Sequence, residues 1–531
     1  MKKLLMFKKL ILVAGVIIPN FLFAQTPPKP NWQNADLQKD SVFGISIEKT
    51  YNELLKNKKH VPVVVAVIDG GVDIEHEDLK SVIWTNPREK AANKVDDDKN
   101  GYVDDIHGWD FIGGAKGDVH HDNLELTRLV RLYKKQFASL DTNALTGPNL
   151  ANFTTYRKLR NELNEGIADA QTGYNNINGF KIALDGLLAG MNKSNPTLED
   201  IRAYEPKNAN DTRAKRVLLN NLPKYKDLNE FVAQQVTAGL DHYKSQLEYH
   251  YNINYDPRDI VGDNYTNSNE RFYGNNEVAG PDADHGSHVA GIIGADRVNK
   301  LGIIGIADDV KIMSVRTVPD GDERDKDVAN AIRYAAENGA KVINMSFGKA
   351  YSYNKKVVDD AVKFAMTKDV LIIHAAGNDN KNTTVENNFP TRVYEDKSGE
   401  AKAWIEVGAS GPADDKTLKA SFSNYGKTSV DVFAPGVAIN STIPGSKYAN
   451  HSGTSMAAPV VAGLAAVIRS YYPKLTAVQV KDIIMKSVVK INHPISLEID
   501  DKETELAFSE LCVTGGIVNA YNALKLAATY K

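Results

Sequence analysis

The chain has 531 residues, of which 42% are hydrophobic and 25% are charged, and its formal net charge is −3 at pH 7. This composition is typical of an ordinary globular protein, and the near-balanced charge gives no reason to expect nucleic acid or an anionic membrane as a partner. The single cysteine, Cys512, excludes intramolecular disulfides and is interpreted as a small buried packing residue.

The N-terminus has the pattern of an export signal. Basic residues precede an apolar run over 10–23, and the small residue Ala24 follows it. This run is shorter than a membrane span of about 20 residues, so it predicts a secretory signal peptide over 1–24, with an uncleaved anchor as the alternative. We therefore expect an exported protein (periplasmic, cell-surface or secreted) with no membrane span once the signal is removed.

Strand-like and helix-like segments alternate along most of the chain. The near-continuous apolar run VPVVVAVIDGG suits a strand that is covered on both faces. Similar runs cover 310–318, 340–348, 370–378, 403–410 and 430–436. Helical patterns cover 288–295, 327–339, 355–369, 455–472 and 477–488. This alternation predicts an α/β fold with a doubly wound, mostly parallel sheet flanked by helices. Ligands bind such sheets beyond the carboxyl ends of the strands, where Asp69 and Asn378 fall.

The region 116–255 interrupts this alternation. Its apolar residues recur at helical spacing, and Thr197 with Asp200 resembles a helix capping box. We therefore expect an inserted helical subdomain. The predicted parts are a signal peptide over 1–24, an N-terminal segment over 25–60, an α/β domain made of 61–115 and 256–531, and the helical insertion over 116–255.

Three short stretches carry residues suited to nucleophilic catalysis. VIDGGVDIEHEDL contains Asp69, DADHGSHVAGIIGA contains His285, and SGTSMAAPVVAG contains Ser455. A serine becomes a useful nucleophile when an imidazole takes its proton and a buried carboxylate fixes that imidazole. Taken singly, the aspartate could be a turn residue, the histidine a cap or surface group, and the serine an N-cap. Taken together, they predict a triad in the order Asp, His, Ser, unlike the order of α/β-hydrolases.

These three stretches resemble the catalytic segments of subtilisin-like serine proteases, as do FSNYG (422–426), DVFAPG (431–436) and AAGN (375–378). The resemblance implies that Asp69 is the acid, His285 the general base and Ser455 the nucleophile. It further implies that Asn378 donates its side-chain amide to the oxyanion, with the backbone N–H of Ser455 as the second donor.

The residues around the serine fit this role. Gly453 leaves room for a substrate backbone, and Ser455 stands at a helix N-terminus that favours negative charge. We expect Pro459 in the first turn of that helix, where its missing N–H costs little.

The resemblance also implies where a peptide substrate would lie. The edge formed by Ser346, Phe347 and Gly348 would pair with an extended substrate as an added strand. The pocket for the side chain before the scissile bond would be lined by Ala375, Ala376 and Gly377. No charged residue stands at an evident pocket base, which favours apolar or mixed side chains.

The acidic stretch DDDKNGYVDDIHGWDF resembles a calcium loop in its spacing. Its candidate ligands are Asp96, Asp98, Asn100, Asp104 and the carbonyl of Tyr102, with a glycine that permits the sharp turn. A histidine occupies the position of the bidentate Glu, so the loop is not a complete EF-hand. The alternatives are a structural calcium site and a solvated acidic turn. We expect no cofactor for catalysis, and we assign His288 to packing and hydrogen bonding rather than to a metal.

The leading functional hypothesis is an exported endopeptidase that acts on polypeptides through an acyl-enzyme. The alternatives are a catalytically idle relative that binds peptides or acts as a scaffold through its helical insertion, and an esterase that uses the same triad. About 35 residues separate the signal from the first core strand, which is short for the inhibitory prodomain common in the family. Either the enzyme folds without one, or the insertion substitutes for it; the insertion also offers a surface for a protein partner.

Overall fold

The computed structural model of the chain describes residues 28–499 and 502–530. Within these ranges the chain forms two compact units, a smaller one over 141–252 and a larger one made of 28–140 with 253–530. The smaller unit lies inside the range predicted for the insertion, and residues 116–140 and 253–255 belong to the larger unit. The predicted signal peptide lies outside the described residues.

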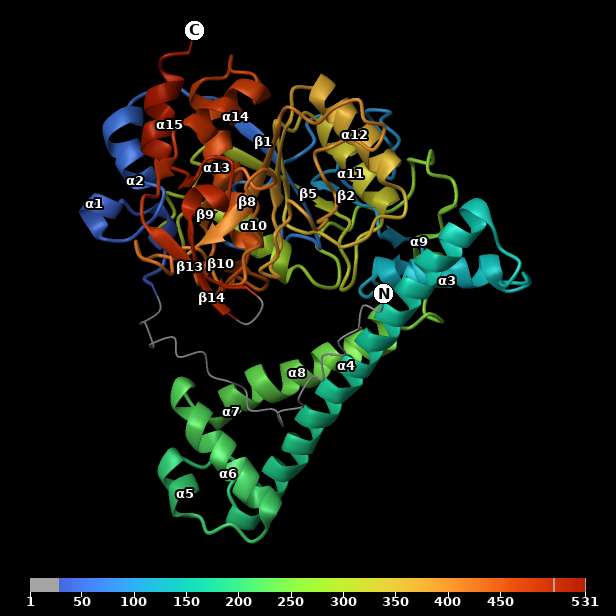
Figure 1. Cartoon of the computed structure of the whole chain (residues 1–531). Helices are drawn as coiled ribbons and strands as arrows, with labels where there is room; N and C mark the ends of the chain where they lie inside the picture. The colour runs from blue at the N-terminus through green and yellow to red at the C-terminus, as the bar shows by residue number, and fades with distance from the viewer. Residues whose placement is uncertain (1–27, 500–501, 531) are drawn as a thin grey trace, which may run out of the picture. The chain divides into compact units, whose positions relative to one another are not determined.

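A large sheet forms the centre of the larger unit (Figure 1). The six predicted strands are present as β1 (Val63–Asp69), β5 (Val310–Arg316), β6 (Val342–Met345), β7 (Leu371–Ala375), β8 (Trp404–Ser410) and β9 (Val432–Pro435). Three short strands complete its edges, namely β2 (Gly108–Asp110), β12 (Val489–Lys490) and β15 (Gly516–Ile517). The order is β12-β15-β9-β8-β7-β6-β1-β5-β2, and all pairs are parallel except β12 with β15.

Alternate side chains of β1 face two different helical layers. Val65 and Val67 share an apolar cluster with α10 (Asp284–Gly294), α13 (Thr454–Tyr471), α14 (Ala477–Lys486) and α15 (Ala520–Ala527). Ala66 and Ile68 share another cluster with α11 (Asp325–Glu337) and α12 (Lys355–Thr367). Both faces of the strand are therefore covered, which explains its near-continuous apolar sequence. Figure 1 shows α11 and α12 on the side of the sheet away from α13 and α14. The doubly wound α/β fold is confirmed.

The segment before β1 packs against this core. The indole of Trp32 donates to the carbonyl of Val437 (3.2 Å), and the hydroxyl of Tyr51 donates to the carbonyl of Ile306 (3.0 Å). The segment contains the helical turns η1 (Trp32–Asn34), α1 (Leu37–Asp40), α2 (Ile47–Thr50) and η2 (Tyr51–Leu55). The remaining elements of the larger unit are β3 (Gly113–Gly114), β4 (Gly117–Asp118), α3 (Glu125–Phe137), α9 (Arg258–Val261), β10 (Ile439–Ile443), β11 (Lys447–His451), β13 (Pro494–Ile499), β14 (Lys502–Ala507) and η6 (Phe508–Glu510).

The smaller unit is helical. Its longest element, α4 (Gly147–Met191), has 45 residues, and a buried cluster that includes Leu187, Leu218 and Phe231 forms its core. The other elements are α5 (Leu198–Ala203), α6 (Ala209–Asn221), η3 (Leu222–Lys224), α7 (Leu228–Phe231), η4 (Val232–Thr237), α8 (Ala238–Ser245) and η5 (Gln246–His250). The capping box of Thr197 and Asp200 is confirmed at the start of α5.

Helix α13 is predominantly apolar and buried along nearly its whole length. Among the described helices it is the one long and apolar enough to cross a membrane, and 89% of its 18 residues are buried inside the protein. Cys512 is likewise buried, in a cluster with Phe433, Phe508 and Leu511, which confirms its packing role.

Candidate active site

The carboxyl ends of three neighbouring strands bring the predicted residues to one edge of the sheet. Strand β6 lies between β1 and β7. Asp69 is the last residue of β1, Ser346 directly follows β6, and Asn378 follows the end of β7. This edge is where a doubly wound parallel sheet presents its ligand-binding residues.

The predicted acid and base are in direct contact. Asp69 Oδ1 accepts a hydrogen bond from His285 Nδ1 (2.8 Å) and another from the backbone N–H of Gly70 (2.8 Å). The side chain of Asp69 is 2% exposed, whereas that of His285 is 45% exposed, so the carboxylate is shielded and the imidazole is accessible. Burial alone lowers the pKa of His285, but the carboxylate of Asp69 outweighs it, and the pKa lies above its usual value.

The predicted nucleophile begins a buried helix. Ser455 is the second residue of α13, and its Oγ donates to the carbonyl of Ser346 (3.0 Å). Among the described residues, Ser455 forms no hydrogen bond to His285 in this structure. To complete a triad, the Oγ of Ser455 would have to turn away from the carbonyl of Ser346 and toward the imidazole of His285. Catalytic hydrogen bonds are often loose in the absence of substrate.

Pro459 corrects one expectation from the sequence. It lies inside α13, at the sixth residue of the helix, and not in the first turn. A proline there cannot donate to the carbonyl four residues earlier, which is that of Ser455. The hydroxyl of Ser346 donates to this carbonyl instead (2.9 Å). Ser346 and Ser455 are therefore joined by two reciprocal hydrogen bonds.

Asn378 is held beside the serine by its own carboxamide oxygen. Its Oδ1 accepts from the backbone N–H (2.9 Å) and the hydroxyl (3.0 Å) of Thr454. That hydroxyl in turn accepts from the N–H of Gly377 (3.0 Å). These bonds occupy the oxygen of Asn378, and its Nδ2 would lie 3.4 Å from a Cβ placed on Gly453. Because a carboxamide nitrogen can only donate, Asn378 keeps one donor that is not used in holding it to Thr454.

The two segments expected to bind substrate lie beside each other, and sequence reasoning missed a residue between them. Asn388 Nδ2 donates to the carbonyl of Ala375 (3.0 Å). A Cβ placed on Gly348 would lie 2.4 Å from Asn388 Oδ1, and one on Gly377 would lie 3.6 Å from it. The carboxamide of Asn388 therefore occupies the space between the ends of β6 and β7. It belongs to an irregular loop, and no spacing in the sequence marks it.

Two further histidines, His288 and His451, lie close to the candidate site and contact each other. His288 Nε2 donates to the carbonyls of Ile439 (3.0 Å) and Ala449 (3.1 Å), which confirms its hydrogen-bonding role. Its ring lies 4.3 Å from that of His451, measured between centroids. His451 Nε2 lies 2.8 Å from Asp284 Oδ1. Burial lowers the pKa of His288 to about 3, so this ring stays neutral.

The residues expected to bind calcium do not all point the same way. Asp104 accepts from the backbone N–H groups of Asn93 (3.1 Å) and Lys94 (2.9 Å), one with each oxygen. Asn100 Oδ1 accepts from the N–H of Tyr102 (2.8 Å). Asp96 also accepts from the backbone, at Oδ1 from the N–H of Asn100 (3.1 Å) and at Oδ2 from that of Gly101 (2.8 Å). Asp96 and Asp98 both approach Glu89, a residue outside the predicted set.

Comparison with known proteins places the chain in a family. The model of the subtilase family matches residues 62–515. The thermophilic serine proteinase of Bacillus sp. (strain AK1) is 45% identical over 188 residues, which are 35% of this chain and 43% of that protein. The cell wall-associated protease of Bacillus subtilis (strain 168) is 34% identical over 288 residues, 54% of this chain and 28% of that protein. Subtilisin BL of Lederbergia lenta is 34% identical over 199 residues, 37% of this chain and 67% of that protein.

The chain thus spans less than half the length of the first two of these relatives. The family match itself begins just before β1 and ends just before β15, so it includes nearly the whole central sheet and every residue of the candidate site. The chain belongs to the subtilase family.

Proposed function

We propose that this protein is an exported serine endopeptidase that hydrolyses peptide bonds through Asp69, His285 and Ser455. The contact of 2.8 Å between Asp69 and His285, at the sheet edge where α13 presents Ser455, carries the proposal. Family membership supports it, and so do the names of the relatives, which are proteases.

The chemistry follows from the positions of the protons. Because Asp69 accepts from Nδ1–H of His285, the lone pair of Nε2 is free to take the proton of Ser455. The serine oxygen then attacks the scissile carbonyl carbon. The protonated His285 gives its proton to the leaving amine, and an acyl-enzyme remains. Water, activated by the same imidazole, attacks this ester and releases the second product.

Charge develops on the carbonyl oxygen in both steps. Asn378 Nδ2 and the backbone N–H of Ser455 are the donors that we assign to it. The bonds from Thr454 fix the carboxamide of Asn378 before substrate arrives. A donor held in advance loses little energy to reorganisation during the reaction, which is the source of its catalytic effect.

The substrate is proposed to lie along the edge of Ser346, Phe347 and Gly348, in the manner of an added strand. The side chain before the scissile bond would enter between this edge and Ala375, Ala376 and Gly377. Asn388 adds an uncharged polar group to that space. We therefore expect acceptance of polar as well as apolar side chains, without a strong preference for a charge.

An active-site probe tests this function against its main alternative. A fluorophosphonate should label the parent protein and fail to label Ser455→Ala. Absence of labelling in a folded parent would favour a catalytically idle scaffold that acts through the helical unit. Cleavage profiling of a peptide library by the parent, with Ser455→Ala as control, then defines the side-chain preference. Turnover of activated esters without turnover of peptides would indicate an esterase.

Export is proposed from the basic and apolar N-terminal pattern. One relative is named a cell wall-associated protease, which agrees with a location outside the cytoplasm for that protein. N-terminal sequencing of the mature protein provides the test. A new N-terminus close to residue 25 supports a cleaved signal, and an intact N-terminus at Met1 would contradict it.

A further inference from the structure

A polar side chain lies in the apolar layer between the central sheet and α13. Asn344 is the third residue of β6 and is 0% exposed. It pairs with Val67 of β1 on one side and with Ile373 of β7 on the other. Both partners belong to the apolar cluster that the sheet shares with α13, and paired residues of neighbouring strands face the same side of a sheet. Asn344 therefore presents its carboxamide to the helix that carries Ser455.

The fold alone gives no reason for a carboxamide at this position. Asn344 Nδ2 donates to Ser346 Oγ (2.9 Å). Its Oδ1 is buried and accepts no hydrogen bond from the described residues. A buried oxygen without a donor is costly, because the water that it loses on folding is not replaced. An apolar side chain of similar shape would avoid this cost, so we looked for the role of Asn344 in its one bond to Ser346.

That bond begins a chain of hydrogen bonds that ends at the candidate nucleophile. Ser346 Oγ accepts from Asn344 and donates to the carbonyl of Ser455 (2.9 Å). A hydroxyl has a single proton, so a donor on one side helps to fix the direction in which that proton points. Consecutive hydrogen bonds also polarise and strengthen one another. Because Pro459 deprives the carbonyl of Ser455 of its helical donor, the hydroxyl of Ser346 is what holds it.

We propose that Asn344 is a positioning residue for the nucleophile and acts through the hydroxyl of Ser346; this inference rests on the proposed function. The backbone around the nucleophile is held at two points. The N–H of Thr454 is bound to Asn378 (2.9 Å), and the carbonyl of Ser455 is bound to Ser346. Between these points lie the N–H that we assign to the oxyanion and the Cα that carries Oγ of Ser455.

Replacing Asn344 should therefore loosen the second of these two points. Asn344→Leu and Asn344→Val remove the donor to Ser346 without adding a polar atom. The rate of fluorophosphonate labelling reports on the nucleophile and does not depend on an extended substrate lying along the edge. We expect this rate and kcat on a peptide to fall together by about tenfold or more, with KM changing by about twofold or less.

Stability should respond in the opposite sense to activity. In the Ser455→Ala background, Asn344→Leu should unfold at the same denaturant concentration as the parent or at a higher one, because it removes a buried oxygen without a donor. The matched control is Asn330, a buried asparagine of α11 whose Nδ2 donates to the carbonyl of Glu270 (3.0 Å) and to the hydroxyl of Tyr273 (3.0 Å). Asn330→Leu should unfold at a lower denaturant concentration, yet in the active protein it should be labelled at the parent rate. A loss of both stability and labelling in the two Asn344 variants would indicate a structural role and overturn the proposal.

A double-mutant cycle tests the route through Ser346. Ser346→Ala removes the hydroxyl, so adding Asn344→Leu to it should lower the labelling rate no further. Additive losses would overturn the proposal, and so would labelling of folded Asn344→Leu and Asn344→Val within about twofold of the parent rate. Failure of the parent itself to be labelled is a different result: it would contradict the proposed function, and this inference with it.

Discussion

His451 Nε2 lies 2.8 Å from Asp284 Oδ1, and this hydrogen bond connects the strand that leads to Ser455 with the helix that carries His285. His451 is the last residue of β11, and Asp284 is the first residue of α10. The two residues thus join the segments that must bring nucleophile and base together. The neutral ring of His288 lies against that of His451, with an interplanar angle of 34°.

Asp284→Asn should shift the pH profile of the reaction. Burial favours the neutral form of His285, whereas Asp69, Asp284 and Asp282 all favour its protonated form. Removing the charge at position 284 lowers the pKa of His285. Because the base must be neutral to act, the acidic limb of kcat/KM should move to lower pH, by about half a unit or less for a charge near the surface.

The measurement is kcat/KM on one peptide across the pH range. Asp185→Asn, an exposed acid of the smaller unit that pairs with Lys181, is the charge-matched control and should leave the profile unchanged. A shift of the Asp284→Asn profile to higher pH would contradict the sign worked out from these charges.

Replacement of Asn378 should separate oxyanion donation from positioning. Asn378→Ala removes the amide donor and should lower kcat by about 10²–10³ with little change in KM. Asn378→Asp keeps an oxygen that can accept from Thr454 but replaces the donor with a negative oxygen, so its kcat should fall at least as far. Thr454→Ser keeps both bonds to Asn378 and serves as the control.

Steady-state kinetics on a peptide substrate checks this assignment. If either change at position 378 acted on KM alone, the residue would serve substrate binding and not the developing oxyanion. Preserved kcat in Asn378→Asp would likewise show that only the bond to Thr454 matters.

The pairing of Ser346 with Pro459 predicts a compensating double substitution. Ser346→Ala removes the hydroxyl that satisfies the carbonyl of Ser455, which should cost about 1–3 kcal/mol in unfolding free energy. Pro459→Ala restores the helical N–H that can reach the same carbonyl. The double variant should therefore be destabilised by about 1 kcal/mol less than the sum of the two single variants.

Denaturant unfolding of these variants in the Ser455→Ala background gives the coupling energy. Tryptophan fluorescence is suited to it, because all four tryptophans, Trp32, Trp84, Trp109 and Trp404, lie in the larger unit. Strict additivity would mean that the proline does not determine how the carbonyl of Ser455 is satisfied.

The sheet could be predicted because its central strands are buried on both faces. Such strands appear as continuous apolar runs, and β1 and β5 to β9 were found where these runs occur. The edge strands β2, β12 and β15 have only two or three residues each, too few for any periodicity. The N-terminal helical turns could not be predicted for the same reason, although Trp32 and Ile47 contribute to the core.

In the candidate site, too, the residues that lie in local sequence motifs could be predicted, and those in irregular loops could not. Asp69, His285, Ser455 and Asn378 stand in stretches with local patterns, and the structure brings them to one edge of the sheet. Asn388 and Glu89 lie outside such patterns. Each reaches its neighbours through the path of an irregular loop, and only tertiary packing determines that path.

Glu125 should control the acid stability of the larger unit. Its Oε2 lies 2.7 Å from Arg128 and 3.0 Å from Lys349, the residue that follows the proposed substrate edge. Burial alone would raise the pKa of Glu125, but the two cations outweigh it and lower the pKa to about 2. The carboxylate therefore stabilises the fold above its unfolded pKa of 4.5, and this contribution is lost as the pH falls toward 2.

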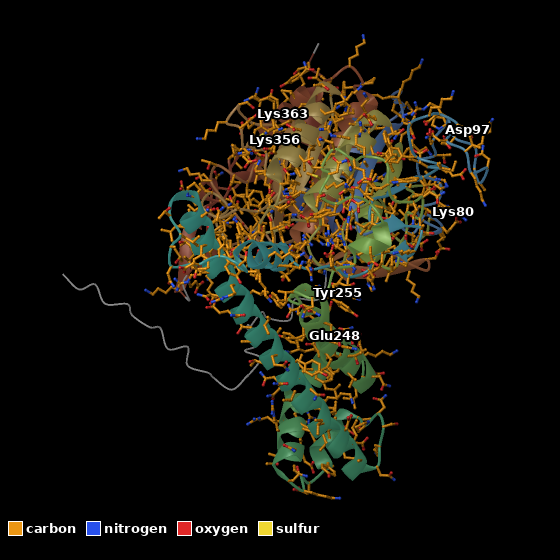
Figure 2. The ribbon with its side chains drawn as sticks, turned by 90° about the vertical axis from the view of Figure 1, so that its right-hand side faces the viewer. Lys80, Asp97, Glu248, Tyr255, Lys356 and Lys363 are labelled. Carbon is orange, nitrogen blue, oxygen red and sulfur yellow. The ribbon has the colours of Figure 1, made fainter. Side chains whose placement is uncertain are left out.

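Glu125→Gln should accordingly lower the unfolding free energy at neutral pH by about 3–5 kcal/mol, because it leaves two buried cations short of a partner. Its stability should also vary less than that of the parent between pH 4.5 and about 2. Denaturant unfolding followed by tryptophan fluorescence measures both. Glu248→Gln, an exposed change in η5 of the smaller unit (Figure 2), should follow the parent throughout. An acid profile of Glu125→Gln as steep as that of the parent would assign the acid sensitivity to other carboxylates, such as Asp122 beside Arg324.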